Sequence, residues 1–129
     1  MKQALFVIFL LSLLLSCSST PKQEDIVAET AKQYYTYLLR NNYDAYVDGH
    51  YREDSIPHSY REQLKDNAKM FMAQQQTDHQ GIKEIRITKS EVDTRKHAAN
   101  AFLVLVYGDK TSEEIVVPMV EHNKIWYLR

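Results

Sequence analysis

From residue 24 onward, the spacing of apolar residues changes at Gly81. Between residues 24 and 80 they recur at steps of three and four, which is typical of amphipathic helices, whereas after Gly81 they alternate with polar residues, as in strands. Residues 4–15 differ from both patterns because they form an apolar run interrupted only by Ser12. The sequence therefore predicts an apolar N-terminal segment, then helices, then a sheet.

The first two helices are expected to form a corner. Thr20-Pro21-Lys22-Gln23 has the form of a capping box with proline at the first helical position, so a helix should begin there or soon after and span about 24–40. Its apolar face carries Val27, Ala31, Tyr34 and Leu38. Asn42 can cap a short second helix over 43–47, which Gly49 would end in the left-handed conformation.

A third helix is expected to begin at Ser55 or Ser59 and to end near Gln75, before a turn at 78–81. One face of this helix carries an apolar stripe, which consists of Tyr60, Leu64, Ala68, Phe71 and Met72. The opposite face is charged, with Arg61, Lys65, Asp66 and Lys69.

Four strands are expected after Gly81, at 82–91, 98–107, 113–121 and 124–129. Their connections are of turn length, which favours an antiparallel meander. The second strand is apolar on both faces and should be central, whereas Pro118 in the third strand lacks an N–H group and requires a bulge or an unpaired edge. Helices followed by a meander predict an α+β domain in which the sheet curls around the helices.

The N-terminal segment resembles a lipoprotein signal. Lys2 gives a positive start, and Leu14-Leu15-Ser16-Cys17 resembles the lipobox that places Cys17, the only cysteine, at the start of the mature chain. About twelve apolar residues are too few for a spanning helix, which needs roughly 20; a cleaved signal without lipid is the alternative. We therefore expect a signal peptide at 1–16, a lipidated tether at 17–23 and one domain at 24–129.

The anchor also predicts a location and partners. The protein is expected to attach to a membrane through Cys17 in the cell envelope, and Ser18, in place of an aspartate, favours the outer membrane of a Gram-negative bacterium. Without residues 1–16 the chain has 15 basic and 17 acidic residues, interspersed, which argues against a nucleic-acid partner. Neither a phosphate loop nor a compact histidine pair is present, so no cofactor or metal is expected.

Two motifs of the helices and the sheet carry a family resemblance. The corner Asn42-Tyr43-Asp44 after the first helix and the final strand pattern from Lys124 to Leu128, which contains Trp126, are similar to those of small bacterial lipoproteins of domain of unknown function 4878, within the nuclear transport factor 2-like superfamily. The resemblance covers 24–129 and implies a cystatin-like cone of helices on a curved four-stranded meander. Such a fold implies a cavity between the concave sheet and the helices. Here His122-Asn123-Lys124 replaces the usual glycine-containing turn.

Seven of the nine tyrosines lie between Tyr34 and Tyr60, and they suggest an aromatic lining for this cavity. The candidate ligand-binding residues are Tyr34, Tyr46, Tyr60 and Trp126; the alternative is that they are core residues with their hydroxyl groups at the surface. Asp48 and His50 are candidates for a proton-transfer pair, because catalytic relatives use a carboxylate or histidine that faces the cavity. The alternative is that Asp48, four residues after Asp44, is a solvated corner residue.

Three functions follow from these observations. The leading interpretation is a non-enzymatic envelope protein that binds a small hydrophobic or aromatic molecule, a peptide or a protein. The alternatives are a small isomerase-like or hydratase-like enzyme that uses Asp48 and His50, and a structural homodimer that pairs through the sheet.

Overall fold

The computed structural model describes residues 20–129. The predicted signal peptide and Cys17 lie outside these residues. Over the described range no helix combines the length and apolar character needed to cross a membrane. The elements, in chain order, are α2 (Gln23–Leu39), α3 (Tyr43–Asp48), α4 (His58–His79), β1 (Ile82–Asp93), β2 (Ala98–Tyr107), β3 (Ser112–His122) and β4 (Ile125–Leu128).

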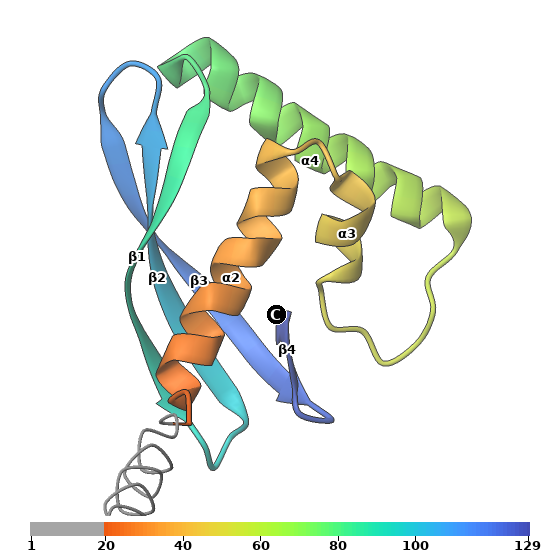
Figure 1. The fold of residues 1–129 in the computed structure, drawn as a ribbon. Coiled ribbons are helices and arrows are strands. Elements are labelled where there is room, and N and C mark those ends of the chain that lie inside the picture. The colour runs from red at the N-terminus through yellow and green to blue at the C-terminus, as the bar shows by residue number, and fades with distance from the viewer. Residues whose placement is uncertain (1–19) are drawn as a thin grey trace, which may run out of the picture.

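The strands form one antiparallel sheet in the order β1-β2-β3-β4, so the predicted α+β meander is confirmed. The sheet is strongly twisted, and α2 lies across its inner face, with α3 and α4 beyond the end of α2 (Figure 1). On β2 the register places Leu103 between Ile87 and Ile115, all three on the inner face. The residues that face inward on these strands are therefore the ones that the alternation in the sequence predicted.

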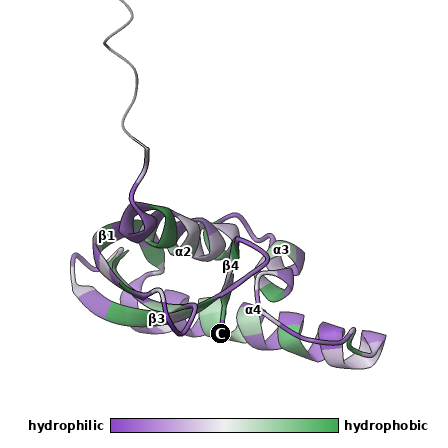
Figure 2. Cartoon of the chain, turned by 90° about the horizontal axis from the view of Figure 1, so that it is seen from below, coloured by the Kyte–Doolittle hydropathy of each residue, from purple (hydrophilic) through white to green (hydrophobic). Residues whose placement is uncertain are grey.

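The core lies between α2 and the inner face of the sheet. Val27 and Ala31 of α2 are fully buried against Leu103 of β2 and Trp126 of β4. The hydropathy-coloured view shows apolar residues on α2 and on the strands that it faces (Figure 2). Burying one large apolar side chain stabilises a fold by about 1.5–3 kcal/mol, so this layer is the main source of stability.

Helix α4 ends four residues later than expected, at His79. Its last turn is polar, so the apolar spacing carries no signal for it. The helix ends because Gln80 and Gly81 both adopt left-handed conformations, with φ of 61° and 84°. The N–H of Gly81 donates to the carbonyl of Gln75 at 3.0 Å.

The predicted cap of α3 is confirmed, whereas that of α2 is wrong. The Oδ1 of Asn42 accepts a hydrogen bond from the N–H of Ala45 at 3.2 Å. Helix α2 begins at Gln23 after Lys22, whose side chain makes no capping bond, so Pro21 precedes the helix. Instead, two acidic residues in the first turn, Glu24 and Asp25, stabilise the start of the helix through their charge near the positive end of the helix dipole.

Gly49 ends α3 for a reason other than the predicted one. Its φ of −70° and ψ of −13° are right-handed, so no left-handed conformation is required. A Cβ atom at this position would instead overlap the ring of Tyr34. Glycine is needed here because α2 and the end of α3 approach each other too closely for any side chain.

The segment after α3 continues along the outer edge of β4. The N–H of Leu128 donates to the carbonyl of Gly49, and the N–H of Tyr51 donates to the carbonyl of Leu128, both at 2.8 Å. His50 thereby pairs with Leu128 in a parallel bridge. The hydroxyl of Tyr34 adds a bond of 2.7 Å to the carbonyl of Trp126. The helical corner is thus attached to the last strand.

Pro118 occupies the unpaired position that the sequence required. Its carbonyl accepts a bond from the N–H of Arg129, on the side of β3 that faces β4. Because both polar groups of an antiparallel strand residue point to the same side, the proline nitrogen also faces that side. The missing N–H group therefore costs no hydrogen bond between β2 and β3. On the side that it faces, the four-residue strand β4 has already ended at Leu128.

We expect Gly49→Ala to lower the free energy of unfolding by about 1–3 kcal/mol, because the added methyl group must displace the Tyr34 ring. Urea denaturation of the single variants and of the double variant with Tyr34→Ala measures this. Without the ring, the alanine should cost little or nothing, since right-handed φ and ψ suit it. An equal cost in both backgrounds would show that the ring is not the reason for glycine.

Candidate functional site

A pocket of about 320 Å³ lies between the end of α2, α3 and the middle of α4. We call it the helix pocket. Its apolar lining consists of Leu38, Val47, Leu64, Ala68 and Phe71, and four side chains with polar atoms complete it: Tyr46, His50, Arg52 and Asn67. Apolar walls with a few polar groups are typical of small-molecule sites.

The helix pocket exists because the apolar stripe of α4 is only partly covered. Helix α4 contacts α3 and β1 and extends beyond the sheet (Figure 1). Ala68 is its one buried residue, whereas the side chain of Phe71 is 39% exposed and that of Tyr60 is 50% exposed. The predicted stripe is therefore correct in position, but much of it borders the pocket or solvent instead of the core.

The ring of His50 is held in the pocket by two contacts with Tyr46. Its Nδ1 lies 3.1 Å from the carbonyl oxygen of Tyr46, and its ring meets the Tyr46 ring edge-on at 5.1 Å. A carbonyl can only accept, so Nδ1 carries the proton and Nε2 is the acceptor nitrogen of the neutral ring. Burial lowers the pKa of His50 below its ordinary value of 6.5, which keeps the ring neutral at neutral pH.

Arg52 lies in the loop after α3 and is half-buried at the pocket. Its Nη1 donates to the carbonyl of Val47 at 2.9 Å and reaches that of His50 at 3.5 Å. These bonds fix the guanidinium against the end of α3. The sequence pattern gave no indication of this residue, because the loop has no periodicity and a single arginine carries no motif.

Asp48 is bound to α4 rather than to His50. Both of its carboxylate oxygens accept bonds from Arg61, and Asp44 accepts bonds from Arg61 at 3.1 Å and Lys65 at 3.3 Å. The hydrogen bonds from Arg61 hold the pKa of Asp48 below its ordinary value. The structure thus gives the two members of the predicted proton-transfer pair different partners. Over residues 20–129, no cluster of three or more potential metal ligands occurs.

The sequence contained a signal for this ion-pair set. Asp44 and Asp48 are four residues apart on α3, and Arg61 and Lys65 are four residues apart on α4. Equal spacing with opposite charge allows two helices to pair along one face. Both acids are well exposed, so the set contributes mainly to orientation, since exposed pairs contribute little stability.

The four predicted ligand-binding residues do not form one wall. Tyr46 lines the helix pocket, whereas Tyr60 lies half-exposed on α4. Trp126 is buried in the core, with its Nε1 donating to the Oε1 of Gln23 at 3.2 Å. Tyr34 bridges α2 and β4 through its hydroxyl group. Because α2 packs directly on the sheet around Trp126, the helix pocket opens beside this layer and not within it.

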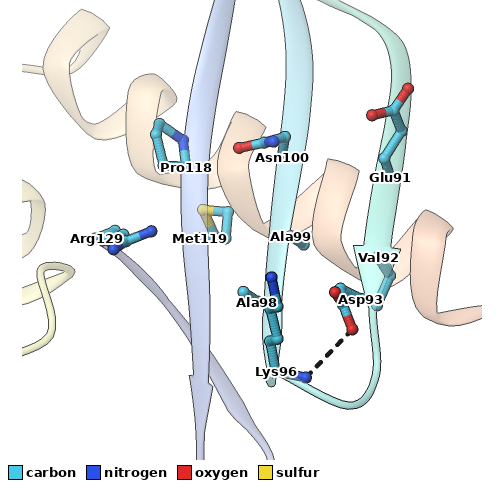
Figure 3. A pocket seen from close by; sticks show the side chains of 10 residues that line it. All are labelled: Glu91, Val92, Asp93, Lys96, Ala98, Ala99, Asn100, Pro118, Met119 and Arg129. Carbon is cyan, nitrogen blue, oxygen red and sulfur yellow. Dashed lines mark hydrogen bonds between the residues drawn. The ribbon is translucent and has the colours of Figure 1, made fainter.

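A second hollow, of about 300 Å³, lies on the outer face of the sheet (Figure 3). Its side chains come from β1, β2, the turn between them, β3 and the residue after β4, and its rim carries both acidic and basic residues. The Asp93 carboxylate already accepts bonds from the backbone N–H groups of Arg95 and Lys96. Four of its ten lining residues are charged, whereas Arg52 is the one arginine, lysine or carboxylate in the lining of the helix pocket, so the helix pocket is the better candidate site for an apolar ligand.

The lowered pKa of His50 predicts a pH dependence of stability. The unfolded chain protonates this ring near pH 6.5, but the folded protein does so only at lower pH. The stability that the buried, neutral ring contributes is therefore fully present above about pH 7, and it is lost progressively as the pH falls toward the pKa of His50 in the folded protein. Urea midpoints measured from about pH 7 to 5 should fall less steeply in His50→Gln than in the wild type. Equal slopes would contradict the burial of this ring.

Comparisons with known proteins support the fold. No family model and no curated protein matches the sequence. Among solved structures, the chain is similar to a Campylobacter jejuni protein described as an NTF2-like transpeptidase, with a TM-score of 0.62, 12% identity, and coverage of 78% of this chain and 94% of that one. At this identity the likeness concerns the fold alone. The chain therefore has the NTF2-like fold.

Proposed function

We propose that this chain is a lipid-anchored cell-envelope protein that binds a small, largely apolar molecule in the helix pocket and catalyses no reaction. The observation that carries the proposal is the pocket itself. It has five apolar side chains and few polar ones, and it results from an apolar stripe of α4 that the core leaves uncovered. An occupant would cover Phe71 and Leu64, which gives binding its driving force.

The polar groups at the pocket favour binding over catalysis. A general base needs a pKa near the working pH and a free position. Asp48 has neither, because Arg61 holds both of its oxygens and lowers its pKa. The alternative, a small isomerase-like or hydratase-like enzyme, would depend on His50 alone, because its ring pairs with the carbonyl of Tyr46 and with no carboxylate of residues 20–129.

The anchor is proposed from the sequence pattern around Cys17, which precedes the described residues. Helix α2 begins at Gln23, so six residue steps separate it from Cys17. A fully extended chain of this length spans about 20 Å. A lipid on Cys17 would therefore hold the domain close to the bilayer, and the cell envelope is the proposed location, with the outer membrane favoured by Ser18.

Two neighbouring residues of α4 test the pocket. Phe71 lines it, whereas Met70 is 68% exposed and does not. We expect Phe71→Ala to weaken binding of the uncharged fluorescent probe N-phenyl-1-naphthylamine about threefold to tenfold, as about 1 kcal/mol of apolar contact is lost. Ala68→Phe, which fills the pocket, should abolish binding. Met70→Ala should leave it unchanged.

Fluorescence titration of the full chain in lipid nanodiscs, corrected with empty nanodiscs, measures these affinities. Thermal unfolding of each variant shows whether the fold is retained. Equal effects of Phe71→Ala and Met70→Ala, or unchanged binding in a folded Ala68→Phe protein, would contradict binding in the helix pocket.

We expect Cys17→Ala to move the protein from the membrane fraction to the aqueous fraction with its domain still folded. The reason is that the lipid would be the attachment and the core would be independent of it. Fractionation, with circular dichroism of the released protein, measures this. Retention in the membrane fraction would disprove the lipid anchor.

A further inference from the structure

Arg52 has donors that the fold leaves unused. An arginine guanidinium carries five N–H groups, and Nη1 of Arg52 is occupied by the carbonyl groups at Val47 and His50. Nε and Nη2 have no hydrogen-bond partner within residues 20–129, and no carboxylate in this range lies within 4.0 Å of the side chain. Because Arg52 is half-buried and makes no direct ion pair in this range, a partner that enters the pocket and accepts from these N–H groups would be favoured.

The free side of this guanidinium matches a carboxylate. Nε and Nη2 lie on one edge of the planar group and form a fork, which binds the two oxygens of a carboxylate in parallel. The bonds from Nη1 already fix the plane, so little side-chain entropy remains to be lost on binding. The other groups nearby do not compete, because Asp48 is held by Arg61 and the ring of His50 makes its bond to Tyr46.

The rest of the helix pocket requires an apolar body on the same molecule. Leu64, Ala68 and Phe71 of α4 form one wall, and Leu38 with Val47 forms the opposite one. The lining contains no second arginine or lysine, so one negative charge is matched and a second would be unpaired. The volume of about 320 Å³ suits a small molecule and not a folded partner.

We infer that the occupant of the helix pocket is an amphipathic monocarboxylate, with its carboxylate on the Nε and Nη2 edge of Arg52 and its apolar body against Leu64, Ala68 and Phe71. The inference rests on the binding function proposed above and adds the chemical class of the ligand. Arg52 is thus the residue that selects for charge, and α4 supplies most of the contact area.

A pair of probes that differ only in charge tests this inference. 4-Phenylbutyrate and 4-phenylbutyramide have the same size and the same apolar body, but the amide is neutral. Calorimetric titration of the full chain in lipid nanodiscs at neutral pH, with empty nanodiscs subtracted, should give at least about tenfold tighter binding for the carboxylate. Arg52→Gln should remove this preference, so that the carboxylate and the amide bind with similar affinity.

The control variants separate charge from structure. Arg52→Lys keeps the charge without the fork and should retain only part of the preference. Because Arg52 also supports the loop, thermal unfolding of both variants accompanies the titrations. The comparison of the two probes on the wild-type protein needs no variant and stands if a variant does not fold.

Each outcome has one meaning. Equal affinity of the two probes for the wild type, or a preference that survives in folded Arg52→Gln, would overturn the monocarboxylate inference and leave the apolar pocket in place. If neither probe binds and N-phenyl-1-naphthylamine does not bind either, both the pocket function and the ligand class are wrong.

Discussion

The arrangement of the helical corner depends on the attachment of residues 49–51 to β4. Two backbone hydrogen bonds join Gly49 and Tyr51 to Leu128, and the Tyr34 hydroxyl adds a third bond to the same strand. These bonds are possible because Gly49 has no side chain where it meets the Tyr34 ring. They fix the direction in which the chain leaves α3, and thereby place His50 and Arg52 at one end of the pocket and α4 opposite them.

The overall fold could be predicted from the sequence because its determinants are local and periodic. The alternation in β2 placed Leu103 and its neighbours on the inner face, and the spacing of Val27 and Ala31 placed α2 against them. Asn42 was identified as a cap from its position before a short apolar segment. The predicted ends of helices were less accurate where the apolar spacing gives no signal, as in the polar last turn of α4.

The site was harder to predict because it depends on contacts between distant residues. Tyr46 was identified, but Trp126 and Tyr34 belong to the junction of α2 and β4, which no local pattern shows. Asp48 was considered as a base because catalytic relatives use a carboxylate or histidine that faces the cavity. Its actual partner, Arg61, is 13 residues away on another helix. Arg52 was missed because its role comes from the carbonyl groups it meets. The predictions concerning Cys17 stay predictions.

The bridge between residues 49–51 and β4 also affects how the sheet ends. A strand at the edge of a sheet can pair with another chain, but this segment covers the open side of β4. The remaining edge is β1, where Glu84 pairs with Arg86, Lys89 pairs with Glu91, and the register shifts between them. Charged side chains and an irregular register both disfavour strand addition. The sheet is thereby protected from edge-to-edge aggregation on both sides, by its own backbone on one and by charge on the other.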